Sequence, residues 1–247
     1  MDKQFETAVA LLRNAKHAVA FTGAGISVES GIPPFRGDDG IWSKYDPAIL
    51  ELSTYLNTPE KVWPVIRKLF FNYFADAKPN AAHLALAKLE SAGMLKGVIT
   101  QNIDNLHQEA GSENVIEYHG NSKTFICTQN NQHVSHANEV DFQQPYPKCP
   151  VCDSLCKPSF IFFGEAIPFN AIEQSEWHAT NCDVMLIVGS TGQVVPAANI
   201  PFVASRNGCK IIEINPEPSA FTYEISNFVL KGTATKVLSQ LITRLDF

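Results

Sequence analysis

The chain has 247 residues, of which 45% are hydrophobic and 18% are charged, and its formal net charge is −6. This length and apolar content suffice for a large buried core and exclude a disordered chain. The sequence contains no run of about 18 apolar residues, which excludes a membrane-spanning helix. The acidic balance provides no basic surface for nucleic acid.

The N-terminal sequence Met1–Glu6 carries acidic residues and no apolar segment, so we expect no secretory signal and a cytoplasmic location. The cytoplasm is reducing, and disulfides are rare there. We therefore interpret the six cysteines as metal ligands, core residues or reactive thiols.

Strands and helices are predicted to alternate along most of the chain. Short apolar runs typical of buried parallel strands occupy residues 17–22, 97–100, 115–117, 184–188 and 210–214. Apolar residues at helical spacing occupy residues 6–16, 83–92 and 235–245. This alternation predicts an α/β fold with a doubly wound parallel sheet.

Two stretches depart from that alternation and predict a second, smaller lobe. Residues 41–80 are rich in aromatic side chains and are expected to be helical, and residues 122–158 hold four of the six cysteines. We predict a large domain made of residues 1–40, 81–121 and 159–247. The small domain would consist of a helical module, 41–80, and a cysteine-containing module, 122–158.

Glycines and polar residues follow the predicted strands. They are Gly23-Ala24-Gly25, Gln101 to Asp104, His119, Gly189-Ser190 and Asn215. In a doubly wound sheet, ligands bind outside the carboxyl ends of the strands. We therefore expect these residues to meet at one rim of the sheet and to form one binding site.

The Gly23-Ala24-Gly25 segment suits a dinucleotide phosphate cradle, because glycine lets the backbone approach the pyrophosphate. Val28 stands where the usual pattern has its third glycine, so a tight strand–loop turn is an equal alternative on this motif alone. In the loop that follows, Phe35 and Arg36 could cover a ligand and bind its charge, or Phe35 could anchor a surface loop.

His119, just past a strand, could act as a general base near neutral pH, although a histidine taken alone is more often structural. Asn102 and Asp104 occupy alternate positions at a neighbouring strand end, so they could present an amide and a carboxylate together. Groups of this kind could hold a sugar and a carboxamide.

Cys149 and Cys152 form a C-x-x-C pair flanked by turn-forming residues, which favours a zinc knuckle over a thioredoxin-like motif. Cys127 lies upstream, with Asn130 where its own C-x-x-C partner would stand. The candidates for a fourth ligand are Cys156, His133 and His136. A group of reduced thiols without a metal is the alternative.

The chain resembles the sirtuins, the NAD-dependent protein lysine deacylases, in the short form of bacteria and archaea. The matching motifs are GAGISVESGIPPFRG at 23–37, TQNIDNLH at 100–107, YHG at 118–120, FFGE at 162–165, VGSTG at 188–192 and INPEP at 214–218. They occur in the order that the family has. The resemblance implies a Rossmann-like NAD-binding domain beside a small domain made of a helical module and a zinc module.

The resemblance also implies roles for the matching residues. His119 would be the general base that activates a ribose hydroxyl, and Asn102 and Asp104 would hold the nicotinamide ribose and carboxamide. The residues implied to contact NAD are Gly23, Ala24, Gly25, Phe35, Arg36, Gln101, Ile103, Gly189, Ser190 and Asn215. Those implied to pair with an extended substrate peptide are Phe163, Gly164 and Glu165. For the structural zinc we predict the ligands Cys127, Cys149 and Cys152, with Cys156 as the favoured fourth ligand and His133 or His136 in reserve.

Three features depart from the family pattern. Pro34 replaces an aspartate, and Asn130 replaces a zinc cysteine. Sirtuins that prefer succinyl or malonyl lysine carry a tyrosine and an arginine where this chain has Ile66 and Leu69. Without that arginine an acyl carboxylate has no bidentate partner, so we expect uncharged acyl groups unless Arg67 turns into the pocket.

These implications predict an enzyme that consumes NAD and moves an acyl group from lysine to ADP-ribose, with release of nicotinamide. The alternative enzyme is an NAD-dependent protein mono-ADP-ribosyltransferase, and the non-enzymatic alternative is an NAD-sensing or zinc-ribbon binding module. The expected partners are acyl-lysine proteins or peptides, with no nucleic acid and no membrane. The oligomeric state is not predicted.

Overall fold

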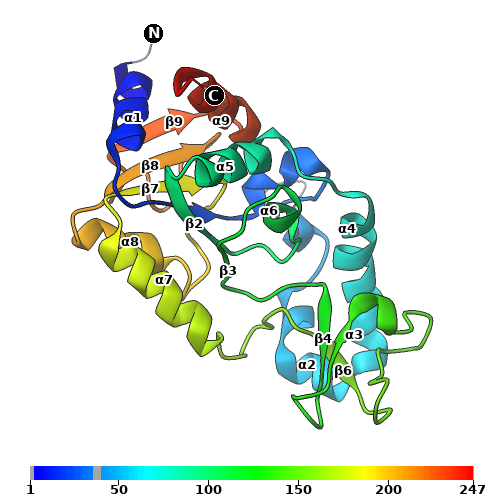
Figure 1. The fold of residues 1–247 in the computed structure, drawn as a ribbon. Coiled ribbons are helices and arrows are strands. Elements are labelled where there is room, and N and C mark those ends of the chain that lie inside the picture. The colour runs from blue at the N-terminus through cyan, green and yellow to red at the C-terminus, as the bar shows by residue number, and fades with distance from the viewer. Residues whose placement is uncertain (1–2, 36–39, 247) are drawn as a thin grey trace.

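The computed structural model describes residues 3–35 and 40–246. A six-stranded sheet runs through the larger lobe in the order β3-β2-β1-β7-β8-β9 (Figure 1). Its strands are β1 (Ala18–Thr22), β2 (Leu95–Thr100), β3 (Val115–Glu117), β7 (Val184–Val188), β8 (Lys210–Asn215) and β9 (Phe228–Lys231). Every neighbouring pair is parallel, which confirms the predicted doubly wound α/β fold.

Helices cover both faces of this sheet, which is why β1 and β7 are buried along their whole length and consist of apolar runs with no alternation. One face packs against α1 (Lys3–Asn14), α5 (Ala81–Ser91) and α9 (Ala234–Arg244). The other face packs against α7 (Phe169–Asn181) and α8 (Asn199–Arg206). The short helix α6 (Leu106–Glu109) follows β2.

The strand order reverses between β1 and β7. From β1 the chain builds outward through β2 to β3, and from β7 it builds in the opposite direction through β8 to β9. The connections that follow β1 and β7 therefore lead to opposite sides of the sheet, and the carboxyl ends of the two strands lie next to each other at the reversal. Open α/β sheets bind nucleotides at such a reversal.

The smaller lobe combines helices with a second sheet. The antiparallel sheet, in the order β5-β4-β6, consists of β4 (Thr124–Cys127), β5 (Val134–His136) and β6 (Cys156–Pro158). The helices are α2 (Leu52–Asn57), α3 (Pro59–Ile66), a π-helical turn over Arg67–Asn72, and α4 (Tyr73–Asp76). Figure 1 shows α2, α3, β4 and β6 together, away from the large sheet.

One hydrophobic cluster unites the two parts of this lobe. Trp63 and Phe71, from the helical part, pack against Phe125 of β4 with ring centroids 5.9 and 5.5 Å apart. The domain boundaries given above stay a prediction, and this shared core supports them because residues 41–80 and 122–158 bury their aromatic side chains together.

Short 3-10 turns complete the structure, at Ala24–Ile26, Val28–Ser30, Ile41–Ser43, Pro47–Leu50 and Ala137–Glu139. The sequence-based prediction omitted β9 and the small sheet. β9 buries only Leu230 below the surface, and β4 alternates between buried and half-buried residues, so neither forms a continuous apolar run. Within residues 3–35 and 40–246, no helix combines the length and apolarity needed to cross a membrane.

Candidate active site

The loops after β1 and β7 touch each other at the reversal of strand order. The Gly23 N–H donates to the carbonyl of Val188 over 3.0 Å, and the Gly25 N–H donates to that of Gly189 over 2.9 Å. A Cβ atom at Gly25 would lie 2.6 Å from Gly189 Cα, closer than any real side chain lies. Contact between the two loops therefore already requires glycine here, as a tight turn would, before any nucleotide is considered.

Ser190 joins three strand ends at this rim. Its hydroxyl accepts a hydrogen bond from Gln101 Nε2 at 2.9 Å, and its carbonyl accepts one from Asn215 Nδ2 at 3.1 Å. Gln101 follows β2, Ser190 follows β7, and Asn215 ends β8. The structure thus gathers these three predicted NAD residues on one edge of the sheet.

Asn102 and Asp104 meet at Ser27, a residue that the sequence analysis did not select. Ser27 Oγ donates to Asp104 Oδ2 at 2.6 Å and accepts from Asn102 Nδ2 at 3.2 Å. Asn102 Nδ2 also donates to the carbonyl of Gly23 at 3.2 Å. Burial raises the pKa of Asp104, while the hydrogen bonds from Ser27 and from the Leu106 N–H oppose that shift.

Two buried histidines, to which the sequence analysis gave no role, lie next to the residues around Ser27. His83 Nε2 lies 3.4 Å from Ser27 Oγ, and His107 Nε2 lies 2.9 Å from Thr22 Oγ1. Burial lowers their pKa values to about 4 and about 3, so both rings are neutral at pH 7. His107 could have been identified from its place at the end of the motif at 100–107. His83 lies outside the motifs, and only its contact with Ser27, in the motif at 23–37, links it to the site.

His119 lies at the same rim, after β3. Its Nδ1 lies 3.0 Å from the carbonyl of Gln101, so Nδ1 carries the proton and Nε2 keeps a free lone pair. Burial lowers the pKa of His119, and the hydrogen bond to Gln101 opposes this shift. The next residue, Gly120, has φ 69° and leaves no room for a Cβ, which would lie 2.3 Å from the Ser159 carbonyl oxygen.

Phe35 and Ile103 lie between this rim and the small lobe. The Phe35 ring packs against Trp42 and Phe70, with centroids 5.4 and 6.2 Å away. Ile103 packs against the same hydrophobic cluster and is also half-buried. Arg36, predicted to contact NAD, falls outside the described residues.

The predicted peptide-binding segment pairs with the chain near Glu51. The Phe163 N–H donates to the carbonyl of Leu50 at 2.8 Å, and its carbonyl accepts from the Leu52 N–H at 3.0 Å. Phe163 is exposed, and its ring lies 6.3 Å from that of Trp42. Gly164 has φ 81°, a conformation that favours glycine.

Arg67, in the helical part of the small lobe, does not have a free guanidinium that could turn toward an acyl group. Its guanidinium donates to the carbonyl of Phe142 at 2.7 Å, which directs it toward the three-stranded sheet side of the lobe. Ile66 and Leu69 are buried, and Phe70 is the residue of this segment that reaches Phe35. The Arg67 guanidinium is therefore engaged by the Phe142 carbonyl, and the side chain of this segment that packs on Phe35 is apolar.

Four metal-ligating side chains converge in the small lobe. The ligand atoms of Cys127, His133, Cys149 and Cys152 all lie within 4.8 Å of one another. The Sγ atoms of Cys127 and Cys152 are 3.5 Å apart, and Cys149 Sγ lies 3.6 Å from His133 Nδ1. Ligand atoms around a tetrahedral zinc are about 3.4–3.8 Å apart, given Zn–S near 2.3 Å and Zn–N near 2.0–2.1 Å.

The fourth ligand atom of this group belongs to His133, a reserve candidate of the sequence analysis, and Cys156 as the fourth ligand stays a prediction. Cys156 lies on β6, directly opposite Cys127 on β4, and its side chain is fully buried in the hydrophobic cluster. Its thiol is close enough to hydrogen-bond with Cys149, so it lies beside the group and not within it. Spacing along the chain does not reveal this, because β4 and β5 fold His133 back over Cys127.

The fold and this site define a class: a doubly wound α/β protein with glycine-rich loops and polar residues at its nucleotide-binding reversal, and a cysteine-containing lobe beside it. The comparisons assign the family. The Sir2 family model matches residues 23–196. This chain therefore belongs to the Sir2 family.

Similar proteins cover nearly the whole chain. The NAD-dependent protein deacylase of Pyrococcus furiosus is 45% identical over 239 residues, which are 94% of each chain. The NAD-dependent protein deacetylase 1 of Pyrobaculum aerophilum is 37% identical over 243 residues, 98% of this chain and 95% of that protein.

Solved structures of Sir2 proteins agree with this assignment. A Sir2 homologue in complex with ADP-ribose superimposes with a TM-score of 0.93 at 37% identity, covering 100% of this chain and 97% of that one. A Sir2 protein with a deacetylated p53 peptide and 3′-O-acetyl ADP-ribose has a TM-score of 0.92 at 33% identity, covering 97% and 98%.

Proposed function

We propose that this chain is an NAD-dependent protein lysine deacylase that uses acyl-lysine side chains of proteins or peptides as substrates. The observation that carries the proposal is that Asn102 and Asp104 share Ser27 at the carboxyl-end rim of the sheet, while His119 lies at the same rim against the carbonyl of Gln101. The names of the relatives support it, because NAD-dependent deacylases and a deacetylase match at 37–45% identity over almost the full length.

The nucleotide would lie at the reversal of strand order, against the loops after β1 and β7. We assign the phosphates to Gly23, Ala24, Gly25, Gly189 and Ser190, and the adenosine end to Asn215. Gln101, Ile103 and Phe35 would surround the nicotinamide ribose. The donors and acceptors fit a dinucleotide, because amide, hydroxyl and glycine backbone groups lie on one rim of a parallel sheet.

The reaction divides between two groups of side chains. Asn102 and Asp104, held by Ser27, would orient the nicotinamide carboxamide and ribose while the acyl oxygen of the modified lysine attacks the ribose carbon and nicotinamide leaves. His119 Nε2 would then take the proton of a ribose hydroxyl, whose oxygen attacks the acyl carbon. Addition of water and cleavage of the bond from this carbon to the lysine nitrogen release free lysine and leave the acyl group on ADP-ribose. The Gln101 carbonyl keeps this nitrogen unprotonated by holding the ring's proton on Nδ1.

One assay separates this proposal from mono-ADP-ribosyl transfer. Incubation with NAD and an acetyl-lysine peptide should give nicotinamide, a peptide lighter by one acetyl group, and O-acetyl-ADP-ribose. Nicotinamide release that needs no acyl peptide, with ADP-ribose attached to an unmodified protein, would establish the transferase instead. The cytoplasmic location and the absence of nucleic-acid and membrane partners stay predictions.

We expect the acyl pocket to accept acetyl and longer uncharged groups and to reject succinyl. A succinyl carboxylate would meet Ile66, Leu69 and Phe70, while Arg67 is engaged with Phe142. Burying a polar group with partial compensation costs about 1–3 kcal/mol, and an unpaired charge costs more. Catalytic efficiency on succinyl-lysine should thus be at least about 10–100-fold below that on acetyl-lysine in the same peptide. Equal efficiency would contradict this prediction.

We also propose a structural zinc bound by Cys127, His133, Cys149 and Cys152. Thiolates and imidazole are the ligands that zinc prefers, and a closed four-ligand site of this kind stabilises a small lobe without joining the chemistry. Asn130, which replaces a family cysteine, lies 3.1 Å from His133 Nε2, so it contacts the imidazole from outside the group.

Purified protein should contain about one zinc per chain. Loss of a residue that hydrogen-bonds to a metal ligand weakens metal affinity by about 10–100-fold. His133→Ala removes a ligand itself, so it should weaken zinc affinity by more than this, and it should lower the melting temperature. Cys156→Ser should retain the metal, which makes it the matched control. Competition with a chromogenic chelator measures both variants. Loss of zinc in Cys156→Ser, with retention in His133→Ala, would restore Cys156 as the fourth ligand.

A further inference from the structure

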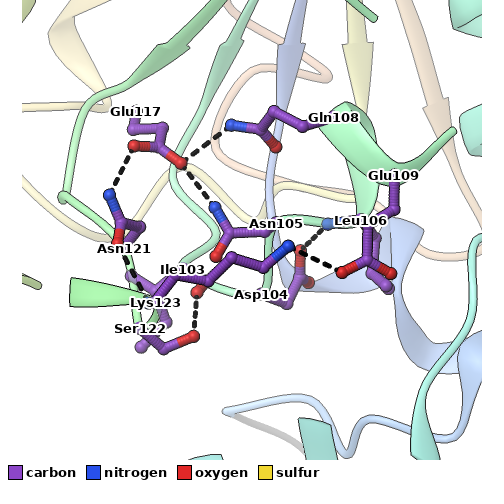
Figure 2. Close-up of polar contacts among 10 residues, drawn as sticks. All are labelled: Ile103, Asp104, Asn105, Leu106, Gln108, Glu109, Glu117, Asn121, Ser122 and Lys123. Atoms are coloured by element: carbon purple, nitrogen blue, oxygen red, sulfur yellow. Dashed lines mark hydrogen bonds and ion pairs between the residues drawn. The ribbon is translucent and has the colours of Figure 1, made fainter. Parts of the chain in front are cut away.

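Three side-chain amides converge on the carboxylate of Glu117, at the end of β3 (Figure 2). Asn105 Nδ2 and Gln108 Nε2 donate to Oε1 at 2.7 and 2.8 Å, and Asn121 Nδ2 donates to Oε2 at 2.8 Å. Hydrogen bonds to a charged group are about twice as strong as neutral ones. This half-buried carboxylate therefore forms three charge-assisted hydrogen bonds to the segments that carry these amides.

The three amides belong to the two segments that carry the proposed reaction. Asn105 follows Asp104 directly and has a left-handed backbone, φ 63°. Asn121 lies two residues after His119, at the far side of the turn made by Gly120. Glu117 thus connects the segment of the proposed nicotinamide site to the segment of the proposed general base, and its own backbone is anchored in the large sheet through β2.

The amide of Asn121 has a fixed orientation. Its Oδ1 accepts from the N–H groups of Lys123 and Thr124 at 3.0 and 3.2 Å, so turning the amide would break these bonds. Asn105 differs, because its Oδ1 is buried without a hydrogen-bond partner in the described chain. Its amide could therefore turn without loss, and Gln108 is exposed and could turn as well.

A second link joins the same two segments at the surface. Lys123 Nζ lies 2.8 Å from Glu109 Oε1, with about half of each side chain exposed to solvent. Exposed ion pairs of this kind contribute little, because solvent and salt screen them. Because this ion pair joins the same two segments as Glu117, a variant that removes it is a matched control for the Glu117 variants.

We propose that Glu117 is a positioning residue, which holds the Asp104 carboxylate and the His119 imidazole in fixed relative positions. The inference rests on the roles proposed above for those two residues. Glu117 itself touches neither of their side chains; it acts through Asn105 and Asn121. A misplacement near 1 Å of a reacting group can cost about 100-fold in rate, so such a link has a measurable effect.

The test compares Glu117→Ala, Glu117→Gln and Glu109→Ala in the full chain. Deacylation of an acetyl-lysine peptide is measured beside exchange of labelled nicotinamide into NAD. Glu117→Ala should lower kcat by about 10–100-fold and leave the peptide KM near the wild-type value. The ratio of exchange to deacylation should rise, because Ser27 and the Leu106 N–H still hold Asp104 while His119 is displaced, and only the forward step needs His119. Glu117→Gln should stay close to wild type, since Asn105 and Gln108 can turn their amides toward the new NH2 group.

Glu109→Ala should match wild type in every measurement. A fall of exchange and deacylation by the same factor in Glu117→Ala would overturn the proposal, because partial unfolding has that effect. A loss in Glu117→Gln equal to that in Glu117→Ala, or a similar loss in Glu109→Ala, would overturn it too. Wild-type protein without exchange or deacylation would contradict the proposed function itself, whatever the variants do.

Discussion

Replacement of His119 by alanine is expected to lower deacylation turnover by about 10²–10⁴-fold, the usual contribution of a general base. The expectation follows from its free Nε2 and from its place beside Gln101. NAD affinity should remain close to wild type, because the loops after β1 and β7 do not depend on this ring. His136→Ala is the matched control, since that histidine is exposed on β5 of the small sheet.

Turnover by peptide mass and NAD binding by calorimetry measure the two quantities separately. Turnover of His119→Ala within a few-fold of wild type would contradict its assignment as the base. Loss of NAD binding in parallel with turnover would instead point to a structural role for the ring.

The same histidine sets the direction of the pH dependence. Burial lowers the pKa of His119 below its ordinary value of 6.5, with the Gln101 hydrogen bond in opposition. A lowered pKa means that the neutral, proton-accepting form persists to more acidic pH. The acidic limb of kcat/KM, which reports the free enzyme, should therefore lie below pH 6.5. A limb at higher pH would show that another group controls the rate.

Replacement of Lys157 by methionine is expected to lower the free energy of unfolding by about 3–5 kcal/mol, the cost of breaking a buried ion pair on one side. Lys157 Nζ lies 3.0 Å from Glu165 Oε1, with side-chain exposures of 10% and 20%. It also donates to the carbonyls of Pro158 and Phe160 at 3.0 and 3.2 Å. Methionine has a similar length but leaves the Glu165 carboxylate without its cation.

The ion pair also supports the segment proposed to bind the peptide. Glu165 Oε2 accepts from the Phe162 N–H at 3.0 Å, so it closes the loop that presents Phe163. We therefore expect the peptide KM of Lys157→Met to rise, while NAD affinity is retained. Urea titration measures the stability change, provided that the denaturant slope is unchanged.

Two controls separate burial from charge. Lys231→Met removes an exposed pair with Glu217, 3.7 Å long and at least 70% exposed on both sides, and should cost less than about 1 kcal/mol. The double variant Lys157→Met with Glu165→Gln should recover part of the loss, because no unpaired charge stays buried. If Lys157→Met alone were as stable as wild type, the ion pair of Lys157 and Glu165 would have to be solvated in solution.

The sequence alone was enough to predict the large lobe and its binding rim. Parallel strands covered on both faces must be apolar throughout, so β1, β2, β7 and β8 are visible as runs bounded by glycine or polar residues. The carboxyl ends of such strands necessarily meet at one edge. Gln101, Ser190 and Asn215 could therefore be grouped before any coordinates were known, and the structure confirms that they touch.

Local sequence pattern does not determine contacts between distant segments. Such contacts determined the metal-ligand group and the hydrogen-bond partners within the candidate site. His133 lies among the metal-ligating atoms because the pairing of β4 with β5 brings it back beside Cys127. Cys156, on β6, is buried opposite Cys127. Ser27, His83 and Glu117 were not selected from the sequence, since each is an ordinary polar residue until burial removes water and leaves only protein partners. Composition and periodicity determined where the strands lie and where a ligand could bind. Which polar groups share hydrogen bonds at that rim depended on the packing of segments that are distant in the chain, such as Ser27 and Asp104, 77 residues apart, and Gln101 and Ser190, 89 residues apart. Only the tertiary structure specifies such contacts.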